Sequence, residues 1–428
     1  MVNVASIFST LGNPNSLIPL AIKDTVSTTG MTVGSFITGK EEGRDRFIDE
    51  VGTEVIWLGG IPFFKWLYDK TIFKALKLDS KFDARNFKDK AVLAKIKEFA
   101  PTKDIKSGID NIIKKEGTFK KAATAKFFVS TGLAVASYIG LTKFKQDYTD
   151  KKIRANLIKE YELNKAKENE QKNDKVEKNF NTSFKGLGSA IQSLAFSPVK
   201  NMWVLDGCIT AERLADSRSK QEFMGYAIKE ASILFFMYYA GGKIQEMLEG
   251  FAEKKHNKSI SLDARVIEDG FLKKSFEDGS IAKSLKEFDL ANKSNADLYE
   301  FLHKNPDNLV VKTAKMSDAI ALHKQTGKID TRKYIDLEDI KGIKGKIDKL
   351  YKQFKTELSK GKTSEEFFSK VKKLKRSSIL MNIGSCMFAL GVLTPAIMLL
   401  NRMAGEGNQE FETKRRIREQ LIKEGIIS

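Results

Sequence analysis

The sequence predicts an all-α integral membrane protein, built from a duplicated two-helix unit with polar helical inserts. Residues 379–400 carry no charged side chain. At about 1.5 Å per residue they form a helix long enough to cross a ~30 Å hydrocarbon core. Three further hydrophobic elements, 52–73, 127–141 and 231–248, precede it. A ten-residue sequence from the middle of the chain recurs near its end, and no segment has the alternating pattern of a β-strand.

The composition is strongly basic, because the 428 residues carry a formal net charge of +19. Such an excess attracts anionic partners, either a membrane surface or nucleic acid. Most lysines, however, are interleaved with Glu and Asp, a pattern typical of solvated faces. The two cysteines, Cys208 and Cys386, cannot form a disulfide framework, and Cys386 is expected to pack as a small hydrophobe.

The first repeat is predicted to cover residues 1–160. Its hydrophobic helices, 52–73 and 127–141, are separated by a polar insert at 75–123. Pro62 should kink the first of these helices. Within the insert, three residues at helical spacing predict a short amphipathic helix, namely Ile105, Ile109 and Ile112.

The second repeat is predicted to follow a charged linker at 161–195. It covers 196–428 and comprises hydrophobic helices at 231–248 and 379–400, a larger polar helical insert at 250–375 and a basic tail at 411–424. Apolar residues three or four apart predict a further amphipathic helix in this insert, namely Ile340, Ile343, Ile347, Leu350, Phe354 and Leu358.

Internal similarity is the main argument for the duplication. KKIRANLIKE at 151–160 matches RRIREQLIKE at 415–424 at six of ten positions, and two more positions exchange Lys for Arg. Each copy follows a hydrophobic helix. Upstream, Glu54 aligns with Glu230 at the beginning of the other pair of hydrophobic helices. We therefore interpret the chain as two copies of one unit.

Small residues mark candidate helix-packing positions. Gly132, Ala136 and Gly140 recur every four residues and form one smooth face, the pattern that lets membrane helices approach closely. Gly384 and Gly391 are candidates for the same role in 379–400.

Glu54 and Glu230 are the candidate intramembrane polar residues. Carboxylates inside a bilayer often mark an ion or proton path. Each lies at the edge of an apolar run, so we expect it to reach water or to cap a helix end. Arg213 and Arg218 are expected to form surface ion pairs of small energetic value.

The motifs of common enzyme chemistry are missing. A P-loop needs Gly five residues before the Gly-Lys pair, but Gly361–Thr363 has Thr356 at that position. Neither a nucleophile motif nor metal-ligand spacing occurs, since the three histidines, His256, His303 and His323, lie far apart. We predict no catalytic residue, cofactor or metal, and no enzymatic activity.

The predicted function is a structural or interaction scaffold in a membrane, multi-pass and placed in a bacterial inner membrane, with Lys-rich helices outside the bilayer. Its predicted partners are the lipid bilayer, anionic lipid headgroups, and a protein partner or a second copy. One alternative is a repeat-built transporter or channel subunit, which needs polar residues between the repeats, where the helix at 379–400 offers only Asn382 and Ser385. Another is a peripheral protein that binds nucleic acid or a membrane surface. It would need clustered basic and aromatic residues, so nucleic acid is not an expected partner.

The expected topology has all four hydrophobic elements crossing the bilayer, with the two repeats parallel. The linker 161–195 and the insert 250–375 then lie on opposite sides of the membrane. If only 127–141 and 379–400 cross, the two segments share one side and the repeats are inverted.

Overall fold

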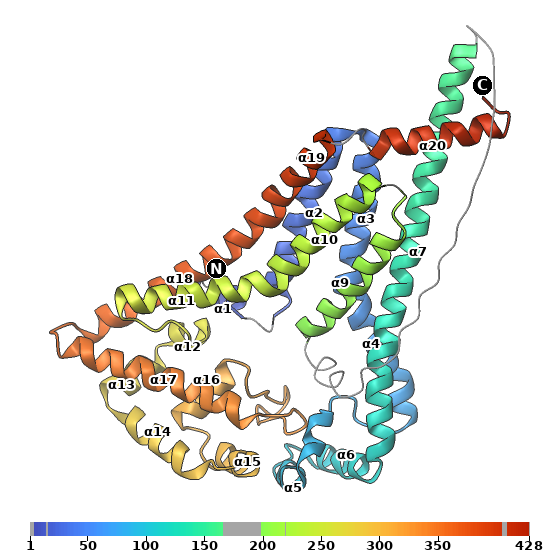
Figure 1. The fold of residues 1–428 in the computed structure, drawn as a ribbon. Coiled ribbons are helices and arrows are strands. Elements are labelled where there is room, and N and C mark those ends of the chain that lie inside the picture. Colours follow the sequence, from blue (N-terminus) through green and yellow to red (C-terminus); the bar gives the residue numbers. More distant parts are fainter. Residues whose placement is uncertain (1–3, 14–15, 166–197, 219, 405–408, 428) are drawn as a thin grey trace.

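The computed structural model describes residues 4–13, 16–165, 198–218, 220–404 and 409–427. All regular structure in these ranges is helical, and their one β-type pairing is an isolated bridge between Leu322 and Ile329. The all-α prediction is confirmed. Long helices form a bundle, and shorter helices form a layer beneath it, which we call the base (Figure 1).

The bundle takes its long helices from both halves of the chain. The first half contributes α2 (Ile18–Thr38), α3 (Lys40–Val55), α4 (Ile61–Tyr68) and α7 (Glu116–Lys165). The second half contributes α9 (Pro198–Ala215), α10 (Lys220–Ile233), α11 (Gly241–His256), α18 (Ser364–Phe388) and α19 (Thr394–Ala404). The short α1 (Val4–Leu11) precedes them, and α20 (Gln409–Lys423) follows them.

Single π-helical turns join three pairs of these helices into longer rods. They cover Ile56–Gly60 between α3 and α4, Leu234–Ala240 between α10 and α11, and Ala389–Leu393 between α18 and α19. A π turn lies just before Pro62, so the backbone hydrogen-bond pattern shifts near the position where a kink was predicted. All four predicted hydrophobic elements are helical, and each is part of a longer rod than its apolar run suggested.

The two predicted polar inserts combine into one base. The first supplies α5 (Lys90–Glu98) and α6 (Lys103–Lys114). The second supplies α12 (Ala264–Asp269), α13 (Phe271–Glu277), α14 (Ser280–Ala291), α15 (Asn295–Lys304), α16 (Leu309–Met316) and α17 (Leu337–Leu358). Residues from both inserts share a single apolar core, for example Phe82, Ile109, Leu298 and Phe354.

The amphipathic helices predicted in the inserts are present. Ile105, Ile109 and Ile112 are all buried in α6. In α17 four residues of the predicted apolar face are buried, namely Ile340, Ile347, Leu350 and Phe354. Ile343 is half-buried, and Leu358 is exposed at the last turn.

Each half packs its last long helix against the first long helix of the other half. Helix α7 lies against α3 and α4 of its own half and against α9 of the second half. Similarly, α18 and α19 lie against α10 and α11 of their own half and against α2 of the first half. Helix α20 crosses the upper part of α7 (Figure 1).

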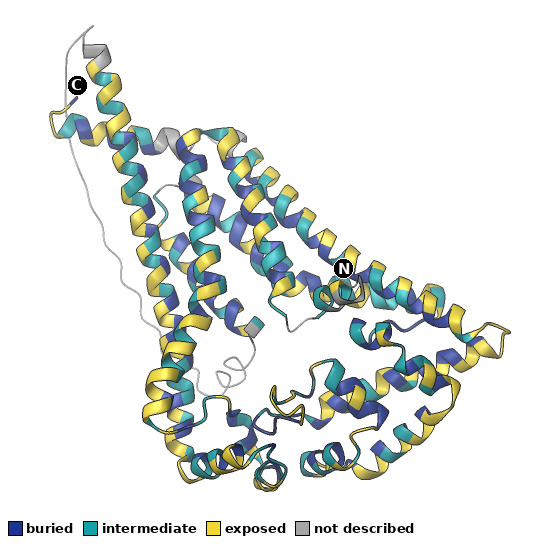
Figure 2. Cartoon of the chain, turned by 180° about the vertical axis from the view of Figure 1, so that it is seen from behind, coloured by how far each residue is buried: buried dark blue, intermediate teal, exposed yellow. Residues whose placement is uncertain are grey.

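Polarity is inverted in the bundle relative to the base. The base buries apolar residues, as a water-soluble domain does. The bundle instead directs large apolar side chains outward and buries charged ones, including Asp49, Lys145 and Arg213. Figure 2 shows buried and exposed residues alternating along its long helices. Outward apolar residues occur on all its long rods, for example Phe36, Ile37, Phe63, Trp66, Phe128, Phe144, Phe235, Phe388 and Leu400.

Two helices in the described part of the chain are long and apolar enough to cross a membrane. They are Glu116–Glu162 and Ser364–Asn401, which contain the predicted elements 127–141 and 379–400.

The candidate packing glycines have different surroundings. Gly391 lies at a backbone crossing with Gly30 of α2, where a methyl group added to Gly30 would lie 2.2 Å from the carbonyl oxygen of Gly391. The smooth face of α7 is turned outward instead: Ala136 is exposed, and a methyl group at Gly132 or Gly140 would meet no atom within 4 Å. Gly384 is equally open. Ala134 and Tyr138 occupy the inward face of α7, which leaves Gly132, Ala136 and Gly140 on its exposed face.

Candidate functional site

A network of ten buried or nearly buried charged residues lies inside the upper half of the bundle, where α3, α7, α9 and α10 meet. Five are acidic and five are basic, so the formal charges cancel. We call it the ion-pair network, and its members are Asp45, Arg46, Asp49, Glu50, Lys145, Arg213, Arg218, Glu222, Lys229 and Glu230.

Arg213 of α9 joins four helices at the centre of this network. Its Nη2 lies 3.0 Å from Oδ2 of Asp49 on α3, and its Nη1 pairs with Oε1 of Glu230 on α10. The same guanidinium donates to the hydroxyl oxygen of Tyr138 on α7 at 2.6 Å and to that of Thr53 at 2.9 Å. Each of the three guanidinium nitrogens thus has at least one polar partner, as burial requires.

Two lysines complete the centre of the network. Lys229 Nζ lies 2.7 Å from Oε2 of Glu50, which links α10 to α3. Lys145 Nζ lies 3.5 Å from Oδ1 of Asp49 and donates to the hydroxyl of Tyr226 at 2.9 Å. Both lysines are only 1 % exposed, so bulk water cannot substitute for these partners.

The network reaches the upper end of the bundle through Arg218. Its Nη2 lies 3.2 Å from Asp45 and 2.9 Å from Glu222. Asp45 also accepts a hydrogen bond from Thr149 of α7 at 2.7 Å. Arg213 and Arg218 therefore correct the sequence-based expectation: neither forms a surface pair, because α3 and α10 bring carboxylates to them inside the bundle.

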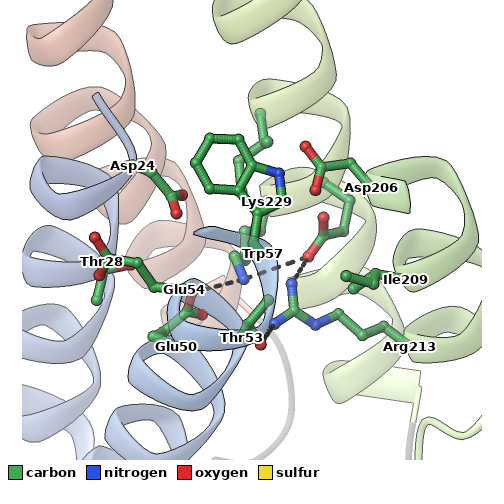
Figure 3. A pocket seen from close by; sticks show the side chains of 12 residues that line it. Asp24, Thr28, Glu50, Thr53, Glu54, Trp57, Asp206, Ile209, Arg213 and Lys229 are labelled. Atoms are coloured by element: carbon green, nitrogen blue, oxygen red, sulfur yellow. Dashed lines mark hydrogen bonds and ion pairs between the residues drawn. The ribbon is translucent and has the colours of Figure 1, made fainter. Parts of the chain in front are cut away.

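A small cavity adjoins the network at its lower end (Figure 3). Its volume of about 20 Å³ is room for a single water molecule. Three carboxylates outside the network, Asp24, Glu54 and Asp206, line it together with Glu50 and Glu230. Arg213 and Lys229 are the cationic residues of this lining, so negative charge predominates.

Hydroxyl groups hold two of these carboxylates. Thr25 donates to Oε1 of Glu54 at 2.6 Å, and Tyr238 donates to Oδ2 of Asp206 at 2.5 Å. The indole nitrogen of Trp57, another lining residue, is buried beside the Tyr238 hydroxyl but makes no hydrogen bond of good geometry within the described residues. A water in the cavity would satisfy that donor.

Both predicted polar residues line the cavity. Glu230 is only 2 % exposed and is paired with Arg213, which corrects the expectation that it reaches water or caps a helix end. Glu54 is half-buried and faces Thr25.

Sequence reasoning did not identify the rest of the site. A usable signal was present in α3, where Asp45 and Asp49 are four residues apart and share one helix face. The Arg213 partner could not be inferred, because its distance along the chain from Asp49 carries no spatial information.

The described residues contain no group of three or more His, Cys, Asp or Glu side chains arranged to hold a metal ion. Chemically, the site offers paired charges, hydroxyl groups and carboxylates, which can bind or relay a proton.

No family model matches the chain, and comparisons with curated proteins and with solved structures also give no match. The fold and site alone therefore define the class: an all-helical bundle with a charged interior and an apolar exterior, joined to a helical base.

Proposed function

We propose that the protein is a multi-pass membrane protein that moves protons through the interface between its two halves. The observation that carries this proposal is the set of buried and half-buried carboxylates between α2 and α3 of the first half and α9 and α10 of the second. Polar residues between the halves are the feature that a repeat-built transporter requires.

The apolar exterior supports the membrane part of the proposal. No charged residue is exposed along 18–37, 47–67, 223–242 or 380–400. Each of these stretches is about 30 Å long at 1.5 Å per residue, which equals the thickness of the hydrocarbon core. Exposed apolar area on this scale is unfavourable in water and favourable in lipid.

Five rods are assigned to the bilayer: α2, α3–α4, α7, α10–α11 and α18–α19. They alternate in direction, so both inserts lie at one end of the bundle and the upper end of α7 lies at the other (Figure 1). This assignment keeps the parallel repeats of the sequence-based topology and adds a crossing, α2. Helix α9 is assigned to the interior, where it is packed among α7 and α10.

The packing supports a duplicated unit of three helices rather than two. In each half the third helix packs against the first helix of the other half: α7 against α9, and α18–α19 against α2. A π turn also follows both α3 and α10. The two copies of the matching sequence pack on each other, with Ile153 of α7 in one apolar cluster with Ile417 and Leu421 of α20. This is the contact expected near a pseudo-twofold axis.

Two polar tracks approach α2 from opposite ends of the bundle. The upper one is the ion-pair network, which ends at the cavity beside Asp24. The lower one runs between α11 and α18: Gln245 donates to Glu249 at 2.8 Å and to Ser378 at 3.2 Å, and Asn382 donates to Gln245 at 3.3 Å.

The lower track ends near Lys23, the neighbour of Asp24 on α2. A methyl group at Gly241 would lie 3.0 Å from Lys23 Nζ and 3.7 Å from Asn382 Oδ1, so these two side chains face the same point. Lys23 is buried and has no acidic partner among the described residues. We infer that Lys23 and Asp24 separate an upper from a lower half-path for protons.

A scaffold remains the second candidate function. It is favoured by the small cavity and by the ion-pair network, in which opposite charges balance. A closed, fully paired interior would hold the base at the membrane without moving any ion.

Topology gives the first test. On a background with Cys208→Ser and Cys386→Ala, single cysteines at Lys159 near the upper end of α7 and at Lys352 in the base should differ in intact cells. One should react with a membrane-impermeant thiol reagent, and the other should react only after permeabilisation. Equal labelling of both, or recovery of the chain in a carbonate supernatant, would refute the membrane assignment.

Proton flux gives the second test. Liposomes containing the purified protein and a pH-sensitive dye should acidify faster than empty liposomes under an imposed proton gradient. Asp24→Asn or Asp206→Asn should lower the initial rate at least about tenfold, because each removes an ionisable group from the path. Asp104→Asn, an exposed change in the base, is the control. Wild-type liposomes no faster than empty ones would leave the scaffold as the function.

A further inference from the structure

A second pocket, separate from the carboxylate cavity, lies where α4 and α7 meet the base. Its volume is about 180 Å³. Three lysines from three parts of the chain line it: Lys65 of α4, Lys126 of α7 and Lys333, which precedes α17. The hydroxyl-bearing Ser80 is a further polar lining residue.

The pocket has an excess of positive charge. Lys126 is paired with Asp69, with Nζ 2.6 Å from Oδ1. Lys65 and Lys333 have no ion-pair partner within the described residues, although neither is fully exposed. Burial lowers the pKa of the Lys333 ammonium, which means that its charge is poorly compensated where it stands. An anion in the pocket would remove that cost.

One wall of the pocket is aromatic. The rings of Phe73 and Phe82 each pack edge-on against Phe119, with centroids 5.9 and 5.4 Å apart. Lys126 Nζ lies 5.5 Å from the centre of the Phe73 ring, and Phe127 completes the lining. Cationic groups beside an aromatic wall suit a ligand with a charged head and an apolar part.

The pocket lies at the level where the exterior changes from apolar to basic. On α7 the exposed side chains change from Lys121 to Phe128 within about 11 Å at 1.5 Å per residue. On α4, exposed Trp66 is followed one turn later by exposed Lys70, which lies in a π turn at Asp69–Phe73. Basic and aromatic residues at such a boundary mark the headgroup region of a bilayer.

We propose that this pocket binds the headgroup of an anionic phospholipid. The three ammonium groups and the Ser80 hydroxyl would hold the phosphate oxygens, and the glycerol end of the acyl chains would lie against Phe127. Lysines bind phosphate as point charges, so the two without an acidic partner, Lys65 and Lys333, favour a net anionic headgroup over a zwitterionic one. The proposal rests on the membrane assignment above but not on proton movement.

The test uses full-length protein in a non-ionic detergent, with thermal unfolding followed by tryptophan fluorescence. Short-chain dihexanoyl phosphatidylglycerol should raise the Tm, and dihexanoyl phosphatidylcholine should not. Lys65→Gln or Lys333→Gln should weaken the response about tenfold in lipid concentration, the effect of losing one charge-assisted contact. Lys70→Gln, an exposed change one turn beyond α4, should respond as wild type does.

Inorganic phosphate tests whether the pocket binds a lipid headgroup or a soluble phosphate compound. If phosphate alone stabilises the protein at the same concentration as the lipid, the site belongs to a soluble phosphate compound and the headgroup proposal is overturned. It is also overturned if Lys65→Gln and Lys333→Gln respond to phosphatidylglycerol as wild type does. Lys65→Arg keeps the charge and should keep the response, which separates charge loss from misfolding. Because the assay needs neither a bilayer nor flux, its outcome is independent of the proton-flux test.

Discussion

Arg213→Leu is expected to destabilise the folded protein by about 3–5 kcal/mol, the usual cost of removing one partner from a buried ion pair. The change removes the guanidinium that pairs with both Asp49 and Glu230, so these two buried carboxylates lose a shared cationic partner and repel each other. It also removes the hydrogen bond to Tyr138, so contacts among α3, α7, α9 and α10 weaken together. Unfolding of detergent-solubilised full-length protein by a graded denaturing detergent measures the loss.

A matched exposed pair provides the control for Arg213. Arg154 of α7 pairs with Glu424 near α20, but its side chain is 37 % exposed. Arg154→Leu should therefore cost less than about 1 kcal/mol. In the double variant Arg213→Leu and Glu230→Gln, part of the stability should return, because the network again balances four acidic against four basic residues and Asp49 keeps Lys145 as a partner. An Arg213→Leu loss no larger than that of Arg154→Leu would contradict the buried network.

Gly30→Ala is expected to have the second-largest effect, a destabilisation of about 3 kcal/mol, near the upper end for overpacking. The new methyl group would lie 2.2 Å from the carbonyl oxygen and 2.8 Å from the carbonyl carbon of Gly391. Both atoms belong to the backbone, so no rotamer change can relieve the clash. Helix α2 must move away from the π turn at Ala389–Leu393.

The same substitution on α7 should have the opposite sign. Gly132 is exposed in the middle of a helix and has open space around it. Gly132→Ala should stabilise the protein by up to about 1 kcal/mol, because Ala has the higher helix propensity. The same denaturing-detergent titration compares the two variants. Equal effects of Gly30→Ala and Gly132→Ala would show that α2 and the π turn do not cross this closely.

Local sequence patterns were sufficient for the helices and for part of the site. Helical spacing identified α6 and α17, since burying one face needs only a 3–4 residue period. Uncharged length identified 127–141 and 379–400, which lie in the two described helices that are long and apolar enough to cross a membrane. The crossing of the bilayer by 52–73 and 231–248 stays a prediction. Alignment of the repeated segments identified Glu54 and Glu230, both of which line the carboxylate cavity.

The interior of the bundle could not be predicted in this way. Charged residues are normally exposed, so Arg213 and Arg218 were expected at the surface, and no role was predicted for Asp49. They are buried because α3 and α10 present acidic groups to basic groups on α7 and α9, segments that are distant in sequence. The smooth face at Gly132 was recognisable from its spacing, but its outward orientation follows from the inward packing of Tyr138.

Periodicity, uncharged length and repetition are properties of neighbouring residues, so the chain alone specified its all-helical class, its hydrophobic helices and the matching positions of Glu54 and Glu230. Ion pairing and close packing depend on which helices meet. The balanced charge network, the backbone crossing at Gly30 and Gly391, and the three-lysine pocket at Lys65 therefore became visible only in the folded arrangement. The physical reason is that a buried charge is stable only beside its partner, and the partners here come from different halves of the chain.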